Sequence, residues 1–258
     1  MRRGAAALTL TALPHLPEVH SGDDLALLLA DALQQAQLQL LGHDVLIVAQ
    51  KVVSKAEGRR VALGGVLPGA RAQELAALTR KDARLVELIL GESTEVLRAK
   101  TDVLIVRHRL GFVMANAGID RSNVAAVAGA DSVLLLPVDP DASAARLRAA
   151  LELRCGTAPG VIISDSFGRP WRRGVVNIAL GAAGIAALVD RRGEPDRAGR
   201  PLEVTEVAAG DALAAAAGLL MGEAAEGIPA VLVRGWLSPQ PHQPARSLLR
   251  PLAEDLFR

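Results

Sequence analysis

Residues 161–174 read VIISDSFGRPWRRG, and this stretch gives the clearest indication of how the chain folds. Three apolar residues, 161–163, predict a short buried strand that ends in the polar tripeptide Ser164-Asp165-Ser166. The glycines, proline and arginines of residues 167–174 predict a polar loop after that strand. Such loops often carry binding and catalytic residues, so the end of this strand is a candidate functional site.

The sequence on either side of this stretch mixes helical and strand patterns. The apolar spacing predicts helices over residues 25–41, 69–80, 82–90, 140–153 and 203–221, and strands over residues 44–49, 95–99, 103–108, 111–115, 132–136 and 230–233. Residues 178–189 fit a strand or a helix equally well. Because hairpin-like and crossover connections are mixed, we predict an α+β fold with mixed or antiparallel sheets rather than a doubly wound sheet.

The composition of the chain excludes several classes of function. The chain has 258 residues, of which 2% are aromatic, so a site built on stacked rings for single-stranded nucleic acid is disfavoured. A net charge of +1 gives no electrostatic reason to bind nucleic acid or an anionic membrane. The longest apolar runs, residues 178–189 and 212–221, are shorter than the roughly 20 residues that cross a bilayer. The lone Cys155 favours a reducing cytoplasm.

No standard catalytic signature is present in the sequence. The chain contains no phosphate loop of the form G-x-x-x-x-G-K-[ST], no G-x-S-x-G elbow and no H-E-x-x-H helix. Gly181 and Gly184 do not complete a dinucleotide-binding G-x-G-x-x-G turn. The five histidines are scattered without ligand spacing, and we interpret them as surface or strand-edge residues.

Three carboxylates lie in segments rich in small residues. Asp120 belongs to the loop of residues 115–123, Asp165 ends the apolar strand described above, and Glu223 follows the predicted helix of residues 203–221. Hard oxygen ligands of this kind suit Mg²⁺ or Mn²⁺. The alternative is a strand-end or capping role, in which each side chain only accepts backbone N–H groups. Sequence spacing leaves both interpretations open.

Basic residues offer a second set of candidates. Arg169, Arg172 and Arg173 surround Trp171 and are suited to hold a phosphate or carboxylate group, while Lys55, at or beyond the end of the strand of residues 44–49, would add a point charge. The alternative for each of these side chains is an exposed, solvated charge.

Five segments in a fixed order carry a resemblance to a known family. They are LPEV at 16–19, VSKAEG at 53–58, NAGIDRSN at 116–123, SDSFGRPWRRG at 164–174, and the stretch from LMGE at 220–223 to VRG at 233–235. Together they resemble the coenzyme F420-0:γ-glutamyl ligase family over about residues 13–235.

The resemblance implies a GTP-dependent ligase that adds L-glutamate to coenzyme F420-0 and then extends the chain through γ-glutamyl bonds. It implies an unusual α+β fold without a phosphate loop, a homodimer, Mg²⁺ or Mn²⁺ as cofactor, and leaves K⁺ open as a further ion. One catalytic unit is expected over residues 1–237, with two interleaved lobes as an open alternative. Residues 238–258 would form a tail, with no nitroreductase-like domain fused to it.

The resemblance also implies roles for individual residues. The expected metal ligands are Asp120, Asp165, Ser166 and Glu223. The expected nucleotide-binding residues are Leu16, Pro17, Glu18, Val19, Gln50, Lys51, Lys55, Asn123, Met221, Gly222, Glu223, Ala224, Ala225, Glu226, Gly227 and Ile228. We expect Lys55, Asp120 and Asp165 to act in catalysis, and add Arg169 and Arg172 as our own hypothesis for holding the anionic substrate.

Two other functions remain to be weighed. One is a metal-dependent ligase or phosphotransferase that acts on another carboxylate substrate. The other is a nucleotide-binding protein without catalysis, although the presence of Asp120, Asp165 and Glu223 argues against it.

Overall fold

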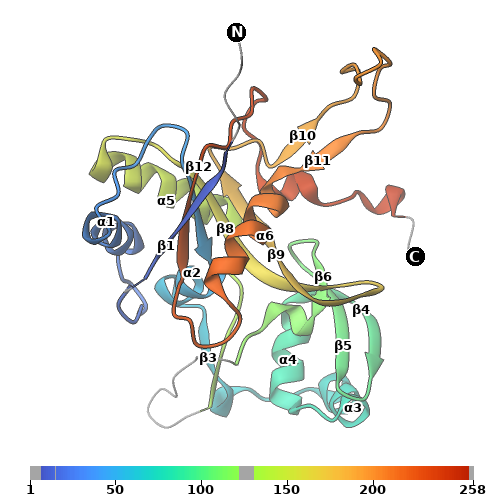
Figure 1. The fold of residues 1–258 in the computed structure, drawn as a ribbon. Helices are drawn as coiled ribbons and strands as arrows, with labels where there is room; N and C mark the ends of the chain where they lie inside the picture. Colours follow the sequence, from blue (N-terminus) through green and yellow to red (C-terminus); the bar gives the residue numbers. More distant parts are fainter. Residues whose placement is uncertain (1–6, 15, 122–130, 256–258) are drawn as a thin grey trace.

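A five-stranded mixed sheet forms the centre of the protein, in a computed structural model that describes residues 7–14, 16–121 and 131–255 (Figure 1). Its strands, in spatial order, are β1 (Thr9–Leu13), β12 (Ala230–Arg234), β2 (Val45–Ala49), β8 (Gly160–Arg169) and β9 (Arg172–Ala183). β2 and β8 are parallel, and the other neighbours are antiparallel. The predicted α+β class with mixed and antiparallel pairing is therefore confirmed.

Helices cover both faces of this sheet. α1 (Leu25–Gln35) and α5 (Pro140–Cys155) pack on one face, and α6 (Ala209–Met221) packs on the other (Figure 1). Successive side chains of a strand point to opposite faces, so Leu46 and Val48 join the core beneath α1 and α5. Val45 and Ile47 join the core beneath α6 for the same reason. Among the described residues, no helix has the length and apolar character needed to cross a membrane.

A smaller antiparallel sheet carries a second core. Its strands β4 (Ser93–Lys100), β5 (Val103–His108) and β6 (Val113–Ala115) pack against α3 (Ala70–Thr79) and α4 (Ala83–Gly91) (Figure 1). Phe112 of this layer meets Phe167 of β8 edge to face, with ring centroids 6.0 Å apart. The small sheet is thereby attached beside the end of β8 at which the candidate residues lie.

Shorter elements connect these layers. They are α2 (Gln50–Ala56), the pair β3 (Arg60–Ala62) with β7 (Ser132–Leu134), the hairpin β10 (Leu188–Asp190) with β11 (Glu206–Ala208), and the 3-10 turns η1 (Leu63–Gly65), η2 (Asn116–Gly118), η3 (Ala245–Leu248) and η4 (Leu252–Glu254). Lys55, expected at or beyond a strand end, lies within α2.

The predicted loop of residues 167–174 is wrong, because the strand continues. β8 runs to Arg169 and pairs with β9 as a long hairpin, in which Trp171 turns the chain with φ 57°. Residues 175–178, just beyond the predicted loop, supply the backbone partners that keep residues 165–168 extended. The same pairing resolves the first half of the ambiguous segment 178–189 as strand, since β9 extends to Ala183.

Two predicted helices are too long. The helix expected over residues 25–41 ends at Gln35, because Gln37 takes a left-handed conformation with φ 56° and Leu38 bonds back to the Leu33 carbonyl. The helix expected over residues 203–221 begins at Ala209, because residues 206–208 pair with residues 188–190 instead. Both corrections follow from backbone contacts that apolar spacing does not encode.

Gly181 marks a close approach between β9 and the start of α5. A Cβ atom there would overlap the backbone carbonyl of Pro140, which a side-chain movement cannot relieve. We expect Gly181→Ala to lower the free energy of unfolding by about 3 kcal/mol, measured by urea denaturation. Gly91→Ala is the matched control, because nothing lies within 4 Å of its Cβ position. Equal stability of the two variants would contradict this packing.

Glu92 joins three cationic or polar side chains beside β4. Its carboxylate lies 3.1 Å from Arg59, 3.0 Å from Arg109 and 3.4 Å from the buried His108. Burial alone would raise the Glu92 pKa, but the nearby His108 ring, the hydrogen bond from Arg109 and the charge of Arg59 lower it to about 2. Arg59, in the segment after α2, also donates to the Leu136 carbonyl at 2.8 Å, so the cluster links the end of α4 to the segments after α2 and β7.

The depressed pKa makes this cluster sensitive to acid. Its contribution is present above the ordinary Glu value of 4.5 and is lost as pH falls toward 2. We therefore expect Glu92→Gln to cost about 2 kcal/mol at pH 7 and progressively less down to pH 3. Unfolding free energies across that range test this, with Glu95→Gln on the exposed end of an Arg107 pair as control. A cost independent of pH would contradict the assignment.

Candidate functional site

A cavity of about 860 Å³ opens between the central sheet and the small sheet. Five segments far apart in the sequence line it, namely residues 16–19, 49–55, 113–120, 164–170 and 221–229. They come from the loop before α1, from α2, from β6 and the turn after it, from the end of β8 and from the loop after α6. The parallel pairing of β2 with β8 brings the carboxyl ends of these two strands to one edge of the sheet, where the cavity lies.

α2 directs basic and amide side chains into the cavity. Lys51 and Lys55 are four residues apart on the helix and so share one of its faces. Lys55 is only 8% exposed, and its Nζ lies 2.6 Å from Oε1 of Glu18. The Ser54 hydroxyl donates to Gln50 Oε1 at 2.8 Å, and this hydrogen bond orients the Gln50 side-chain amide at the start of α2.

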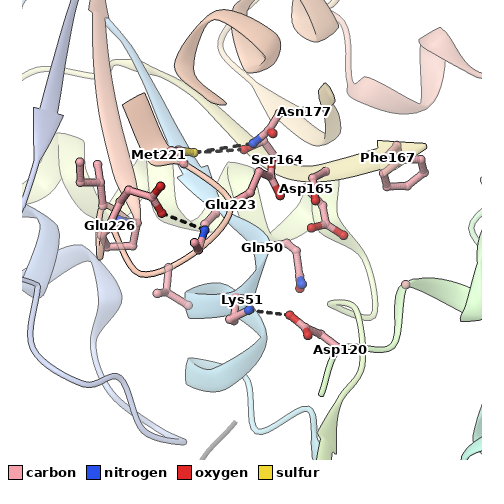
Figure 2. Close-up of a pocket in the computed structure, with 18 of the residues that line it drawn as sticks. Gln50, Lys51, Asp120, Ser164, Asp165, Phe167, Asn177, Met221, Glu223 and Glu226 are labelled. Atoms are coloured by element: carbon pink, nitrogen blue, oxygen red, sulfur yellow. Dashed lines mark hydrogen bonds and ion pairs between the residues drawn. The ribbon is translucent and has the colours of Figure 1, made fainter. Parts of the chain in front are cut away.

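Two carboxylates face this helix across the cavity (Figure 2). Lys51 Nζ lies 2.6 Å from Oδ2 of Asp120, and both side chains are about one quarter exposed. Asp120 is held by reciprocal backbone hydrogen bonds with Leu134 of β7. Burial raises the pKa of Asp165 to about 7, and the negative charges of Asp120 and Glu223 add to that shift. A hydrogen bond from the Ser166 backbone and the charge of Lys51 oppose it.

The lining of the cavity includes oxygen atoms of the kind that divalent cations prefer, on Asp120, Asp165, Ser166 and Glu223. Asp165 is buried beside the negative charges of Asp120 and Glu223, and its pKa stays raised although the charge of Lys51 opposes the shift. In the described part of the chain, however, no three Asp, Glu, His or Cys residues are grouped closely enough to hold a metal ion. Carboxylate and hydroxyl oxygens fit Mg²⁺ or Mn²⁺, and few protein ligands are needed where substrate phosphates supply the rest.

The loop after α6 closes one side of the cavity. Gly222 has φ 71°, a conformation that favours glycine, and a Cβ atom there would also displace the Glu226 carboxylate. Glu226 accepts the Ala224 N–H at 2.8 Å, which holds the loop in shape (Figure 2). The Met221 sulfur accepts from Ser164 and from Asn177, both at 3.9 Å, and joins this loop to β8 and β9.

The arginines of the β8–β9 hairpin divide between two environments. Arg169 and Pro170 line the cavity, and the Arg169 guanidinium donates to the Arg173 carbonyl at 3.1 Å. Arg172 and Arg173 do not belong to the lining, and Trp171 is 82% exposed at the tip.

Most of the predicted site residues meet in this one cavity. The structure brings together Leu16, Pro17, Glu18, Val19, Gln50, Lys51, Lys55, Asp120, Asp165, Ser166, Arg169, Met221, Gly222, Glu223, Ala224, Glu226, Gly227 and Ile228. It does not place Arg172 or Ala225 in the lining. Asn123 lies outside the described residues.

Several residues of the cavity are not predicted from the sequence patterns, and Asn177 is the clearest of them. It is buried, lies on β9 beside Ser164 and Met221, and lines the cavity. A signal was present, because an amide within the apolar run of residues 175–180 is unusual for a strand that only packs. Phe167 and Met114 also line the cavity and form its apolar side.

Comparisons with known proteins agree on one family. Residues 14–235 match the family model described as F420-0:Gamma-glutamyl ligase. A protein of Methanothermobacter thermautotrophicus named Coenzyme F420:L-glutamate ligase is 45% identical over 97% of this chain and 99% of its own length. The proteins of that name from Methanopyrus kandleri and Archaeoglobus fulgidus are 45% and 46% identical, over 99% and 85% of this chain and 99% and 84% of their own.

Proposed function

This chain belongs to the F420-0:gamma-glutamyl ligase family. From that premise we propose that it joins L-glutamate to coenzyme F420-0 and that the cleavage of GTP to GDP and phosphate drives the reaction. It is an enzyme of coenzyme F420 biosynthesis, as its relatives are named. We further propose that it works in the cytoplasm as a homodimer.

The convergence of five distant segments on one cavity supports this proposal most strongly. The cavity combines cationic, carboxylate and apolar groups, in Lys51 and Lys55, Asp120 and Asp165, and Phe167. Its volume of about 860 Å³ falls in the upper range of small-molecule sites. A nucleotide and the carboxylate end of a second substrate are therefore compatible with it in size and charge.

The reaction we propose has two steps. A carboxylate oxygen of F420-0 attacks the γ-phosphorus of GTP, the bond to the bridging oxygen breaks, and GDP leaves. The amine of L-glutamate then attacks the acyl carbon, inorganic phosphate leaves, and the nitrogen loses a proton. The acyl phosphate is needed because a free carboxylate is a poor acyl donor.

The residues of the chain have separate tasks in these steps. Lys51 and Lys55 place ammonium groups on one face of α2, where they offset negative charge on the phosphates. Asp120, Asp165, Ser166 and Glu223 would hold Mg²⁺ or Mn²⁺. When bound, such a cation neutralises charge on the transferred phosphoryl group. Arg169 would bind the anionic part of F420-0 at the other end of the cavity, and K⁺ remains a further candidate ion.

One incubation tests the proposed function. The protein is mixed with F420-0, L-glutamate, GTP and Mn²⁺, and the products are analysed by mass spectrometry. We expect glutamyl adducts together with one phosphate released for each amide bond formed. Absence of both would refute the proposal, and the same adducts formed with GTP omitted would refute its dependence on GTP.

A further inference from the structure

A second pocket, of about 460 Å³, is lined in part by Asp120. Ile119 and Asp120 line both this pocket and the larger cavity, so the two share a wall. We propose that this pocket binds the L-glutamate that accepts the acyl group. The proposal rests on the proposed function, and extends it by assigning a site to the acceptor amino acid.

The charge of the pocket fits a dicarboxylate. Arg80, Lys81 and Arg121 line it against two carboxylates, those of Asp102 and Asp120. Asp120 is engaged by Lys51 at 2.6 Å from the side of the larger cavity, which leaves the lining with an excess of positive charge. L-Glutamate carries two carboxylates, and these match cationic side chains better than they match any other group of the pocket.

Two of these cations are available to a ligand. The ion pairs around the pocket are Arg84 with Asp82, Arg121 with Asp131, and Lys51 with Asp120, so none of them engages Arg80 or Lys81 within the described residues. The neighbouring segment 122–130, which is not described, contains no aspartate or glutamate. Arg121 and Asp131 are each half exposed, and such a pair is weak enough for a bound carboxylate to share the guanidinium.

The pocket also offers acceptors for an ammonium group. Oδ1 of Asn116 is buried and has no hydrogen-bond partner among the described residues, and Asn116 belongs to the lining. Asp120 lines both this pocket and the larger cavity. An amino group bound between these two oxygens would lie next to the cavity in which we place the acyl phosphate. This arrangement orients L-glutamate with its amine toward the acyl phosphate and its carboxylates toward Arg80 and Lys81.

The backbone around the pocket is well fixed. Arg80 ends α3 in a left-handed conformation with φ 55°, and the Lys81 N–H bonds to the Ala76 carbonyl at 3.2 Å. The Asp102 N–H bonds to the Thr79 carbonyl at 3.0 Å and ties the β4–β5 turn to the end of α3. The backbone that carries Arg80 and Lys81 is therefore held in place before a ligand binds, which reduces the entropic cost of binding.

Steady-state kinetics with Arg80→Gln and Lys81→Gln test this assignment. We expect each variant to raise KM for L-glutamate about tenfold and the double variant more, with KM for GTP and for F420-0 within about twofold of wild type. Arg80→Lys should recover part of the loss. Arg71→Gln is the matched control, because Arg71 lies on the same helix and pairs with the exposed Glu74.

Direct titration of the protein with L-glutamate provides a readout that does not depend on turnover. Wild type should bind L-glutamate more tightly than L-glutamine, and the variants should lose this preference. If the double variant still forms adducts and its KM for L-glutamate equals that of wild type, the acceptor site is overturned and the proposed function stands. If KM for GTP or F420-0 rises instead, the pocket binds a phosphate group of one of these substrates, and the L-glutamate site is also overturned. If wild type forms no adduct, the proposed function fails, and the titration alone decides whether the pocket binds L-glutamate.

Discussion

Asp165→Asn is expected to reduce glutamyl transfer at least about 1,000-fold while leaving the protein folded. The side chain lies at the end of β8, where burial and the charges of Asp120 and Glu223 raise its pKa to about 7. An amide keeps the shape of the carboxylate but removes the negative charge that a divalent cation requires. Phosphate release and mass spectrometry of the product measure the loss.

The same variant should be more stable than wild type without added divalent cations. A carboxyl whose pKa rises from 3.8 to about 7 on folding destabilises the native state as pH increases between these values. We therefore expect the Tm advantage of Asp165→Asn to be absent near pH 4 and to reach a few degrees above pH 7.

Asp31→Asn, at an exposed position of α1, controls for the loss of one carboxylate. Undiminished turnover by Asp165→Asn would rule out its catalytic role. A lower Tm than wild type at pH 7.5 would rule out the electrostatic account of its pKa.

Asp120→Asn is expected to lower turnover about 100-fold, mainly by weakening the response to the divalent cation. Asp120 carries one of the charges that act on Asp165, and it forms an ion pair with Lys51. Without this carboxylate, a higher concentration of Mn²⁺ should be needed for half-maximal activity, by about tenfold. High Mn²⁺ should then restore part of the rate, whereas it should not rescue Asp165→Asn.

A titration of activity against Mn²⁺ for both variants separates these two outcomes. The activity of the Asp31→Asn protein should depend on Mn²⁺ concentration in the same way as that of wild type. If Asp120→Asn lowers the rate without shifting the Mn²⁺ dependence, Asp120 acts through Lys51 or the bound substrate and is not a metal ligand.

Local patterns predicted the elements whose ends are set by nearby residues. The helix expected at 69–80 appears as Ala70–Thr79, and the strand expected at 103–108 appears as Val103–His108. The helix expected at 140–153 begins at Pro140, where the Asp139 side chain accepts the Ala142 N–H, and runs to Cys155. Caps and apolar periodicity act over a few residues and are therefore visible in the sequence.

The errors share a different cause. Residues 167–169 are strand because residues 172–176 pair with them, and residues 206–208 are strand because residues 188–190 do. In both places the local sequence is polar or rich in alanine, and the backbone of another segment decides the conformation. Propensity is a weak guide where such pairing is available.

The sequence by itself indicated which residue types are suited to carry chemistry and, through five motifs in order, which family to expect. It did not determine which side chains meet. The tertiary structure decided that Arg169 faces the cavity while Arg172 does not, that Asn177 joins it, and that Asp120 lies between two pockets. The physical reason is that β2 and β8 pair in parallel across more than 100 residues of chain, and only this pairing brings α2 and Asp165 to one edge of the sheet.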